Sequence, residues 1–149
     1  MSIEKRIYLD NCCFNRPYDD QGALRVFLES QAKMYLQEMI RRGELELATS
    51  YVLLYENARN PFTNKRTAIE DFLKAYSSIY IGPERAEKIQ QIAVPIMAAG
   101  IKPMDAYHVA CAIEAECGYF LSTDQRLIKY RSNEIALLNP LDFLRLEEK

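Results

Sequence analysis

Short runs of β-forming residues alternate along this chain with longer segments that have the apolar spacing of helices. Five strands are expected, at residues 7–9, 44–49, 79–81, 119–122 and 134–138. A polar loop is expected at 15–22, one last turn after residue 140, and helices at 23–42, 52–59, 63–76, 82–99, 103–116 and 124–130. Strands that alternate with helices are typical of a mainly parallel sheet, with right-handed crossovers that cover both of its faces. The pattern therefore predicts an α/β sandwich.

The composition is that of an ordinary globular protein. Of the 149 residues, 49% are hydrophobic and 27% are charged, which is enough for the core of one domain, 1–149, and little else. No apolar run approaches the roughly 18 to 20 residues of a membrane span, and the N-terminus lacks the apolar stretch of a secretion signal. The four cysteines form no zinc-binding pattern and are interpreted as reduced thiols. A cytoplasmic protein with no membrane partner is expected.

The formal net charge of −2 lacks the basic footprint that is usual in nucleic-acid-binding proteins. Acids gathered in one site would themselves lower the net charge, and a bound divalent ion would change the local balance. The charge therefore neither indicates nor excludes a nucleic-acid partner.

Four acidic residues stand in or beside apolar segments: Asp10, Glu56, Asp105 and Asp124. Each has an ordinary explanation, as a turn residue, an exposed helical side chain, a charge favoured by the helix dipole or a helix cap. Their joint placement favours a site, because Asp10 and Asp124 follow strands, and parallel strands end at one edge of a sheet. Glu56 and Asp105 lie near the starts of helices. All four carboxylates are expected to meet at one end of the domain.

Carboxylates held close together repel one another unless a cation or protons intervene. Oxygen ligands of this kind suit Mg²⁺ or Mn²⁺. The chemistry that typically uses such a site is attack of water on a phosphodiester, in which metal ions activate the water and stabilise the leaving oxygen. The acids therefore indicate a metal-dependent phosphodiester hydrolase.

Other chemistries fit the sequence poorly. The chain has one histidine, His108, so cleavage of RNA by a pair of histidines is unavailable. The sequence has no G-x-S-x-G elbow of a serine hydrolase and no Gly-rich loop of the kinds that bind nucleotides. We interpret His108 as a structural residue or one that supports site residues.

The order of these motifs resembles the PIN-domain ribonucleases, among them the toxins of VapBC-type toxin–antitoxin pairs. The matching segments are residues 8–11, 50–56, 105–112 and 121–124, in family order. The resemblance implies a three-layer α/β/α sandwich with a five-stranded parallel sheet of order 3-2-1-4-5. It also implies an endoribonuclease that uses Mg²⁺ or Mn²⁺ to hydrolyse RNA, with an antitoxin and a homodimer as partners.

The resemblance also assigns roles by position. The implied catalytic acids and metal ligands are the same four residues: Asp10, Glu56, Asp105 and Asp124. Thr123 and Asn11 would supply hydrogen bonds to the metal-bound water or to the ligands.

The chain departs from the family pattern just after its first acid. Many members have a small polar residue two positions after that acid, where this chain has Cys12. This departure and the weak net charge leave open a PIN-like nucleic-acid-binding module with weak or no catalysis. The same four acids leave open a metal phosphohydrolase that acts on DNA or on a small phosphate. Arg16, in the loop that follows, has two interpretations, a contact to phosphate or an ion pair within the protein.

Overall fold

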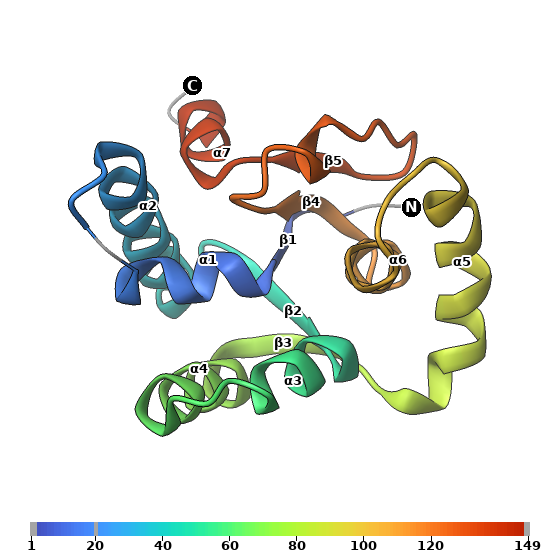
Figure 1. Ribbon diagram of the computed structural model, residues 1–149, viewed down its shortest axis with the longest axis horizontal. Helices are drawn as coiled ribbons and strands as arrows, with labels where there is room; N and C mark the ends of the chain where they lie inside the picture. Colours follow the sequence, from blue (N-terminus) through green and yellow to red (C-terminus); the bar gives the residue numbers. More distant parts are fainter. Residues whose placement is uncertain (1–2, 20, 148–149) are drawn as a thin grey trace.

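A parallel sheet of five strands forms the centre of the molecule, in the order β3-β2-β1-β4-β5 (Figure 1). The computed structural model describes residues 3–19 and 21–147. Each neighbouring pair of strands is parallel. The strands are β1 (Ile3–Leu9), β2 (Glu46–Ser50), β3 (Ser77–Ile81), β4 (Cys117–Leu121) and β5 (Ala136–Leu138). The predicted α/β class and strand order are confirmed.

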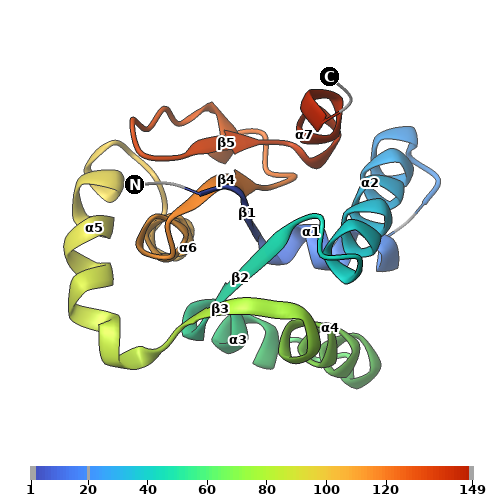
Figure 2. The ribbon, with the colours of Figure 1, turned by 180° about the vertical axis from the view of Figure 1, so that it is seen from behind.

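Helices cover both faces of this sheet (Figures 1 and 2). Helices α2 and α7 pack together on one side, and α5 and α6 pack together on the other. The α-helices are α1 (Asn11–Asn15), α2 (Leu24–Arg41), α3 (Tyr51–Ala58), α4 (Thr63–Tyr76), α5 (Ala86–Ala98), α6 (Pro103–Glu114) and α7 (Pro140–Glu147). Short 3₁₀ helices occur as η1 (Arg16–Tyr18), η2 (Pro83–Arg85) and η3 (Leu127–Lys129). This arrangement is the predicted three-layer sandwich.

Strand β1 lies at the middle of the sheet and supplies its most buried residues. Ile7, Tyr8 and Leu9 have no exposed surface, because β2 and β4 flank the strand and helices cover its two faces. The register pairs Leu9 with Leu121, the last residue of β4. The two strands therefore end side by side, which places Asp10 next to the residues that follow β4.

The segment after β1 is partly helical: α1 precedes the polar loop expected at 15–22, and the 3₁₀ turn η1 lies within that range. Helix α1 is capped by Asp10, whose side chain accepts a hydrogen bond from the Asn11 amide, and it buries Cys13 and Phe14. The turn η1 follows directly. A helix of five residues is too short to show a helical period. Its cap and the burial of Phe14 in the core stabilise it instead.

Several elements of the C-terminal third differ from expectation. The expected helix at 124–130 is only the short η3, and β5 begins at Ala136 rather than at residue 134. Helix α7 has eight residues rather than one turn. Phe143 of α7 has no exposed surface, so this helix packs on the core through an anchor that the short local pattern did not reveal.

Helix α6 ends at Glu114, two residues before the expected end, and its terminal turn is unusual. We expected Gly118 to close the helix, but Gly118 lies inside β4. The left-handed residue after the helix is Glu116, with a φ of 61°.

Two findings bear on the expectations from composition. The four cysteines are free thiols, as predicted, with Cys12 half-buried and the others buried. Within residues 3–19 and 21–147, every helix is too short or too polar to cross a bilayer.

Candidate functional site

Asp10 is held at the junction of β1 and β4. Its backbone N–H donates to the Leu121 carbonyl at 2.9 Å, and its side chain is buried, with only 6% of the residue exposed. The Oδ1 atom accepts from the Asn11 amide at 2.9 Å, and Oδ2 accepts from the Ser122 hydroxyl at 2.9 Å. These bonds fix the carboxylate by backbone and side chain together.

Ser122 connects the ends of the two strands, and sequence reasoning missed it. The residue has no exposed surface. Its Oγ donates to Asp10 and accepts from the Asp124 amide at 3.0 Å. The available signal was a hydroxyl residue directly after a strand and two positions before an acid. The Oγ atom of Ser122 therefore hydrogen-bonds to both the first and the last of the predicted acids, Asp10 and Asp124.

Glu56 pairs with His108 across helices α3 and α6. The Glu56 Oε1 atom lies 2.9 Å from His108 Nε2, and the side chain of Glu56 is one-third exposed while that of His108 is fully buried. On the other side of the ring, Nδ1 lies 2.8 Å from the Tyr8 hydroxyl. The Tyr8 hydroxyl lies 2.7 Å from Ser50 Oγ, which caps α3 by accepting from the Leu53 amide. His108 is thus a buried residue that supports Glu56. This agrees with the interpretation of His108 made from the sequence.

The pKa of His108 reflects this environment. Burial alone would lower it, because a charged imidazole is poorly solvated inside the protein. The hydrogen bond to Glu56 and the charges of Asp10 and Asp105 outweigh burial, so the pKa of His108 is raised above its usual value.

The charges of the three other predicted acids all affect the pKa of Asp105. Asp105 lies in the first turn of α6 and is partly buried. Burial raises the pKa of Asp105, the charges of Asp10, Asp124 and Glu56 raise it further, and His108 opposes the shift. Asp105 therefore lies within electrostatic reach of each of the other three acids.

Asp124 is exposed, and its carboxylate is already engaged in capping. The Oδ1 atom accepts from the amide of Arg126 at 2.9 Å and from that of Leu127 at 3.3 Å. The helix-cap explanation given to this acid thus describes a real interaction. Carboxylate oxygens carry two lone pairs each, so capping leaves capacity for a further ligand.

Thr123 and Asn11, the two residues expected to supply hydrogen bonds, have different surroundings. Thr123 is buried, and its backbone N–H donates to Cys12 Sγ at 3.4 Å. The Oδ1 atom of Asn11 is buried and has no hydrogen-bond partner among the residues that the structure describes. Cys12 itself lies 3.4 Å from Asp10 Oδ2, so the residue that departs from the family pattern still contacts the first acid.

Three side chains at the candidate site lie close enough together to hold a metal ion. One ligand atom from each of Asp10, Glu56 and His108 lies within 4.8 Å of the others. Among the residues that the structure describes, Asp105 and Asp124 are not part of this close group. Both ring nitrogens of His108 already contact Glu56 and Tyr8, which leaves the oxygens of Asp10 and Glu56 as the donors of this group that suit a divalent cation.

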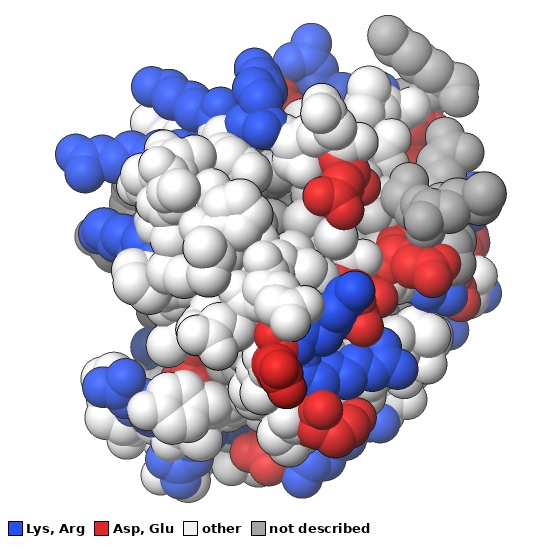
Figure 3. All heavy atoms as spheres, turned by 90° about the vertical axis from the view of Figure 1, so that its right-hand side faces the viewer, with Lys and Arg blue, Asp and Glu red and all other residues white. Residues whose placement is uncertain are grey.

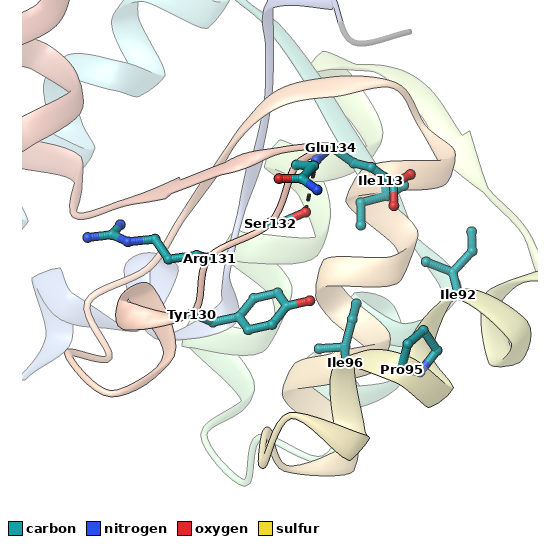
Figure 4. A pocket seen from close by; sticks show the side chains of 9 residues that line it. Ile92, Pro95, Ile96, Ile113, Tyr130, Arg131, Ser132 and Glu134 are labelled. Carbon is teal, nitrogen blue, oxygen red and sulfur yellow. Dashed lines mark hydrogen bonds between the residues drawn. The ribbon is translucent and has the colours of Figure 1, made fainter.

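A hollow of about 230 Å³ occurs elsewhere, between α5, α6 and the segment before β5 (Figure 4). Ile92, Pro95, Ile96 and Ile113 form its apolar wall, and Tyr130 points toward them. None of the four acids lines it. The hollow therefore belongs to a different surface from the candidate site.

Comparison with known proteins bears on the fold. No family model and no curated protein matches the sequence. The structure is similar to FitAcB from Neisseria gonorrhoeae, with 17% identity, a TM-score of 0.54 and coverage of 91% of this chain and 98% of that chain. It is similar to VapBC2 from Rickettsia felis bound to a DNA fragment from their promoter, with 12% identity, a TM-score of 0.55 and coverage of 90% and 98%. A FitAB complex bound to the IR36 DNA fragment matches with 18% identity, a TM-score of 0.57 and coverage of 90% and 94%.

These similarities define the class of fold. FitAB and VapBC complexes contain PIN-domain toxins. The chain has the PIN-like fold, in agreement with the resemblance seen in its motifs. At 12 to 18% identity the similarity concerns the fold alone.

Proposed function

We propose that this protein is a single-domain, Mg²⁺- or Mn²⁺-dependent endoribonuclease that hydrolyses phosphodiester bonds in RNA. The observation that carries the proposal is the grouping of acidic side chains at the end of β1: one ligand atom from each of Asp10, Glu56 and His108 lies within 4.8 Å of the others. A group of mutually repelling carboxylates at the ends of two parallel strands is unfavourable for a fold and useful for binding a cation.

The residues that would hold the ion are carboxylates: Asp10, Glu56, Asp105 and Asp124. When bound, Mg²⁺ or Mn²⁺ lowers the pKa of coordinated water and stabilises negative charge on phosphate oxygens. The chain prepares this site before any ligand binds. Ser122 and the Asn11 amide orient Asp10, and His108 orients Glu56. The Asn11 side chain, whose oxygen has no hydrogen-bond partner among the described residues, and Thr123 are proposed to hydrogen-bond the ligands or the attacking water.

We further propose that the enzyme is the toxin of a toxin–antitoxin pair in the cytoplasm. The similar solved structures are complexes of this kind, and four free cysteines suit a reducing compartment. Leu24, Phe27 and Leu28 at the start of α2 are 71%, 44% and 40% exposed, an apolar surface suited to a protein partner. The face that carries α5 has a broad uncharged area (Figure 3), which suits contact between two copies of the chain.

The test is cleavage of single-stranded RNA by the wild type and by variants that keep the shape of the acids. With Mg²⁺ or Mn²⁺, we expect cleavage that a chelator abolishes. Asp10→Asn and Asp105→Asn should each lower the rate of RNA cleavage by more than the roughly 10- to 100-fold that changes outside the ligand set typically cause. Asp142→Asn is the matched control, because Asp142 is an exposed acid on α7 that pairs only weakly with Arg145, at 3.8 Å.

Three outcomes separate the candidate functions. Cleavage that is unchanged in both Asp10→Asn and Asp105→Asn would contradict the proposed site. Binding of RNA without cleavage under either metal would favour the nucleic-acid-binding module. Hydrolysis of DNA or of a phosphomonoester in place of RNA would favour the other phosphohydrolase.

A further inference from the structure

Glu29, in the second turn of α2, is a buried carboxylate that contacts several segments of the chain. Its side chain has no exposed surface. The Oε1 atom accepts from Arg16 Nε at 2.8 Å. The Oε2 atom accepts from Arg25 Nε at 3.0 Å and from Asn139 Nδ2 at 2.6 Å. A buried carboxylate is stable only when its lone pairs are satisfied by such partners.

These contacts settle the two interpretations of Arg16 in favour of an ion pair. Arg16 follows α1, and its guanidinium contacts both Glu29 and Asp19. Asn139 lies between β5 and α7. Glu29 therefore ties the segment that follows Asp10 to α2 and to the end of β5.

Arg25 extends this group of contacts to the candidate site. While its Nε donates to Glu29, its Nη2 donates to the Thr123 carbonyl at 3.1 Å. The same peptide group carries the Asp124 N–H, which donates to Ser122 Oγ. The Thr123–Asp124 peptide is thus held at its oxygen by Arg25 and at its nitrogen by Ser122. A peptide fixed at both ends sets the direction from which the Asp124 side chain leaves the backbone.

We propose that Arg25, held in place by Glu29, is a positioning residue that fixes the Thr123–Asp124 peptide and so the placement of Asp124. The inference rests on the proposed nuclease function for its catalytic consequence, but its structural consequence is independent of it. Arg25 is suited to this task because a guanidinium presents donors in two fixed directions, which a lysine ammonium does not. A role as an RNA phosphate contact is less compatible with donors already committed to Glu29 and Thr123.

The first test uses the metal-free protein and hydrogen exchange. In Arg25→Met, we expect the amides of Asp124, Arg126 and Leu127 to exchange at least about 10-fold faster than in the wild type, because the segment opens locally. Amides of α4 and β3 should keep their wild-type rates. The matched control is Arg42→Met, since Arg42 caps the other end of α2 and its pairs with Glu38 and Glu44 are long and exposed.

The second test measures RNA cleavage and Mn²⁺ binding. We expect Arg25→Met to lower kcat by about 10- to 100-fold and to weaken Mn²⁺ binding measured by calorimetry, with KM for RNA within about twofold of wild type. Arg25→Lys should recover only part of kcat, and it replaces Arg25→Met in both tests if that variant does not fold. A phosphate contact would instead raise KM and its salt dependence.

The outcomes distinguish this inference from the proposed function. Wild-type protein that fails to cleave RNA contradicts the function, and hydrogen exchange still decides the role of Arg25. Wild-type exchange at Asp124, Arg126 and Leu127 in the Arg25 variant overturns the positioning role. An unchanged kcat with a raised KM would also overturn the positioning role.

Discussion

His108 offers a direct measurement of the site, because it is the only histidine of the chain. Its imidazole contacts Glu56, and that hydrogen bond helps to hold the pKa of His108 above its usual value despite burial. In an NMR titration of the metal-free protein, Glu56→Gln should therefore lower the pKa of His108 relative to the wild type. Glu114→Gln, which removes an acid from the last turn of the same helix, should leave it unchanged.

The same shift has a consequence for stability. A raised folded-state pKa means that the protonated ring stabilises the fold fully below the unfolded pKa of about 6.5 and loses this effect as the pH rises through the folded value. The advantage of wild type over Glu56→Gln should thus be largest in mild acid. A wild-type advantage that grew as the pH rose would contradict the pairing.

Asp105 gives the same sign, although it is an acid. Its pKa is raised by burial and by the other acids, so the folded state binds more protons than the unfolded state between the two pKa values. Stability contributed by this group therefore falls as the pH rises through that interval. Relative to wild type, Asp105→Asn should become more stable between pH 3 and pH 7, by a few tenths to about 1 kcal/mol, since the half-exposed group is screened by solvent. Chemical denaturation of the metal-free proteins, with Asp142→Asn as control, measures this difference.

The positions of the individual acids could be predicted from the sequence, but their hydrogen-bond partners could not. Asp10 and Asp105 stand at places where the sequence marks the end of a strand or the start of a helix. Ser122 and His108 act through hydrogen bonds to residues 112 and 52 positions away along the chain. Such pairs depend on strand register and side-chain rotamers, which no local pattern contains.

Two long helices were predicted almost to the residue, whereas the helix expected at 82–99 is the 3₁₀ turn η2 followed by α5, Ala86–Ala98. Helix α4 was expected at 63–76 and runs from Thr63 to Tyr76, and α2 differs from its expectation by one residue at each end. The short α1 and the turn η3 were not predicted as they are, because both depend on capping by acids of the candidate site, Asp10 and Asp124. The sequence was thus least informative where the site is built.

The end of α6 provides a test at the level of one element. Glu116 has a φ of 61°, a left-handed conformation in which a Cβ is unfavourable and glycine is not. Glu116→Gly should raise the free energy of unfolding by about 0.5–1 kcal/mol, while Glu116→Ala should give no such gain. Urea denaturation checks both, and a glycine variant no more stable than the alanine variant would show that the turn is not strained.

For the whole molecule, the proposed cation site predicts that metal binding stabilises the fold. A ligand that binds only the folded state at 100 times its Kd contributes about 2.7 kcal/mol, which corresponds to a rise of several degrees in Tm for a chain of this size. Mn²⁺ should therefore raise the Tm of wild type and of Asp142→Asn, and a chelator should reverse the effect. Asp10→Asn should show little or no rise; an equal rise would place the ion elsewhere.

The strand order also sets when during synthesis the site can exist. Strand β1 lies between β2 and β4, and the residues that contact Asp10 across the sheet follow β4, which ends at Leu121. A nascent chain that has emerged only as far as α6 contains Asp10, Glu56 and Asp105, but β1 does not yet have β4 beside it. Ser122 and Asp124 have not yet been added at that stage. The candidate site is therefore completed only after β4 and the residues that follow it have emerged, so a protein proposed to cut RNA would remain inactive until that point of its own synthesis.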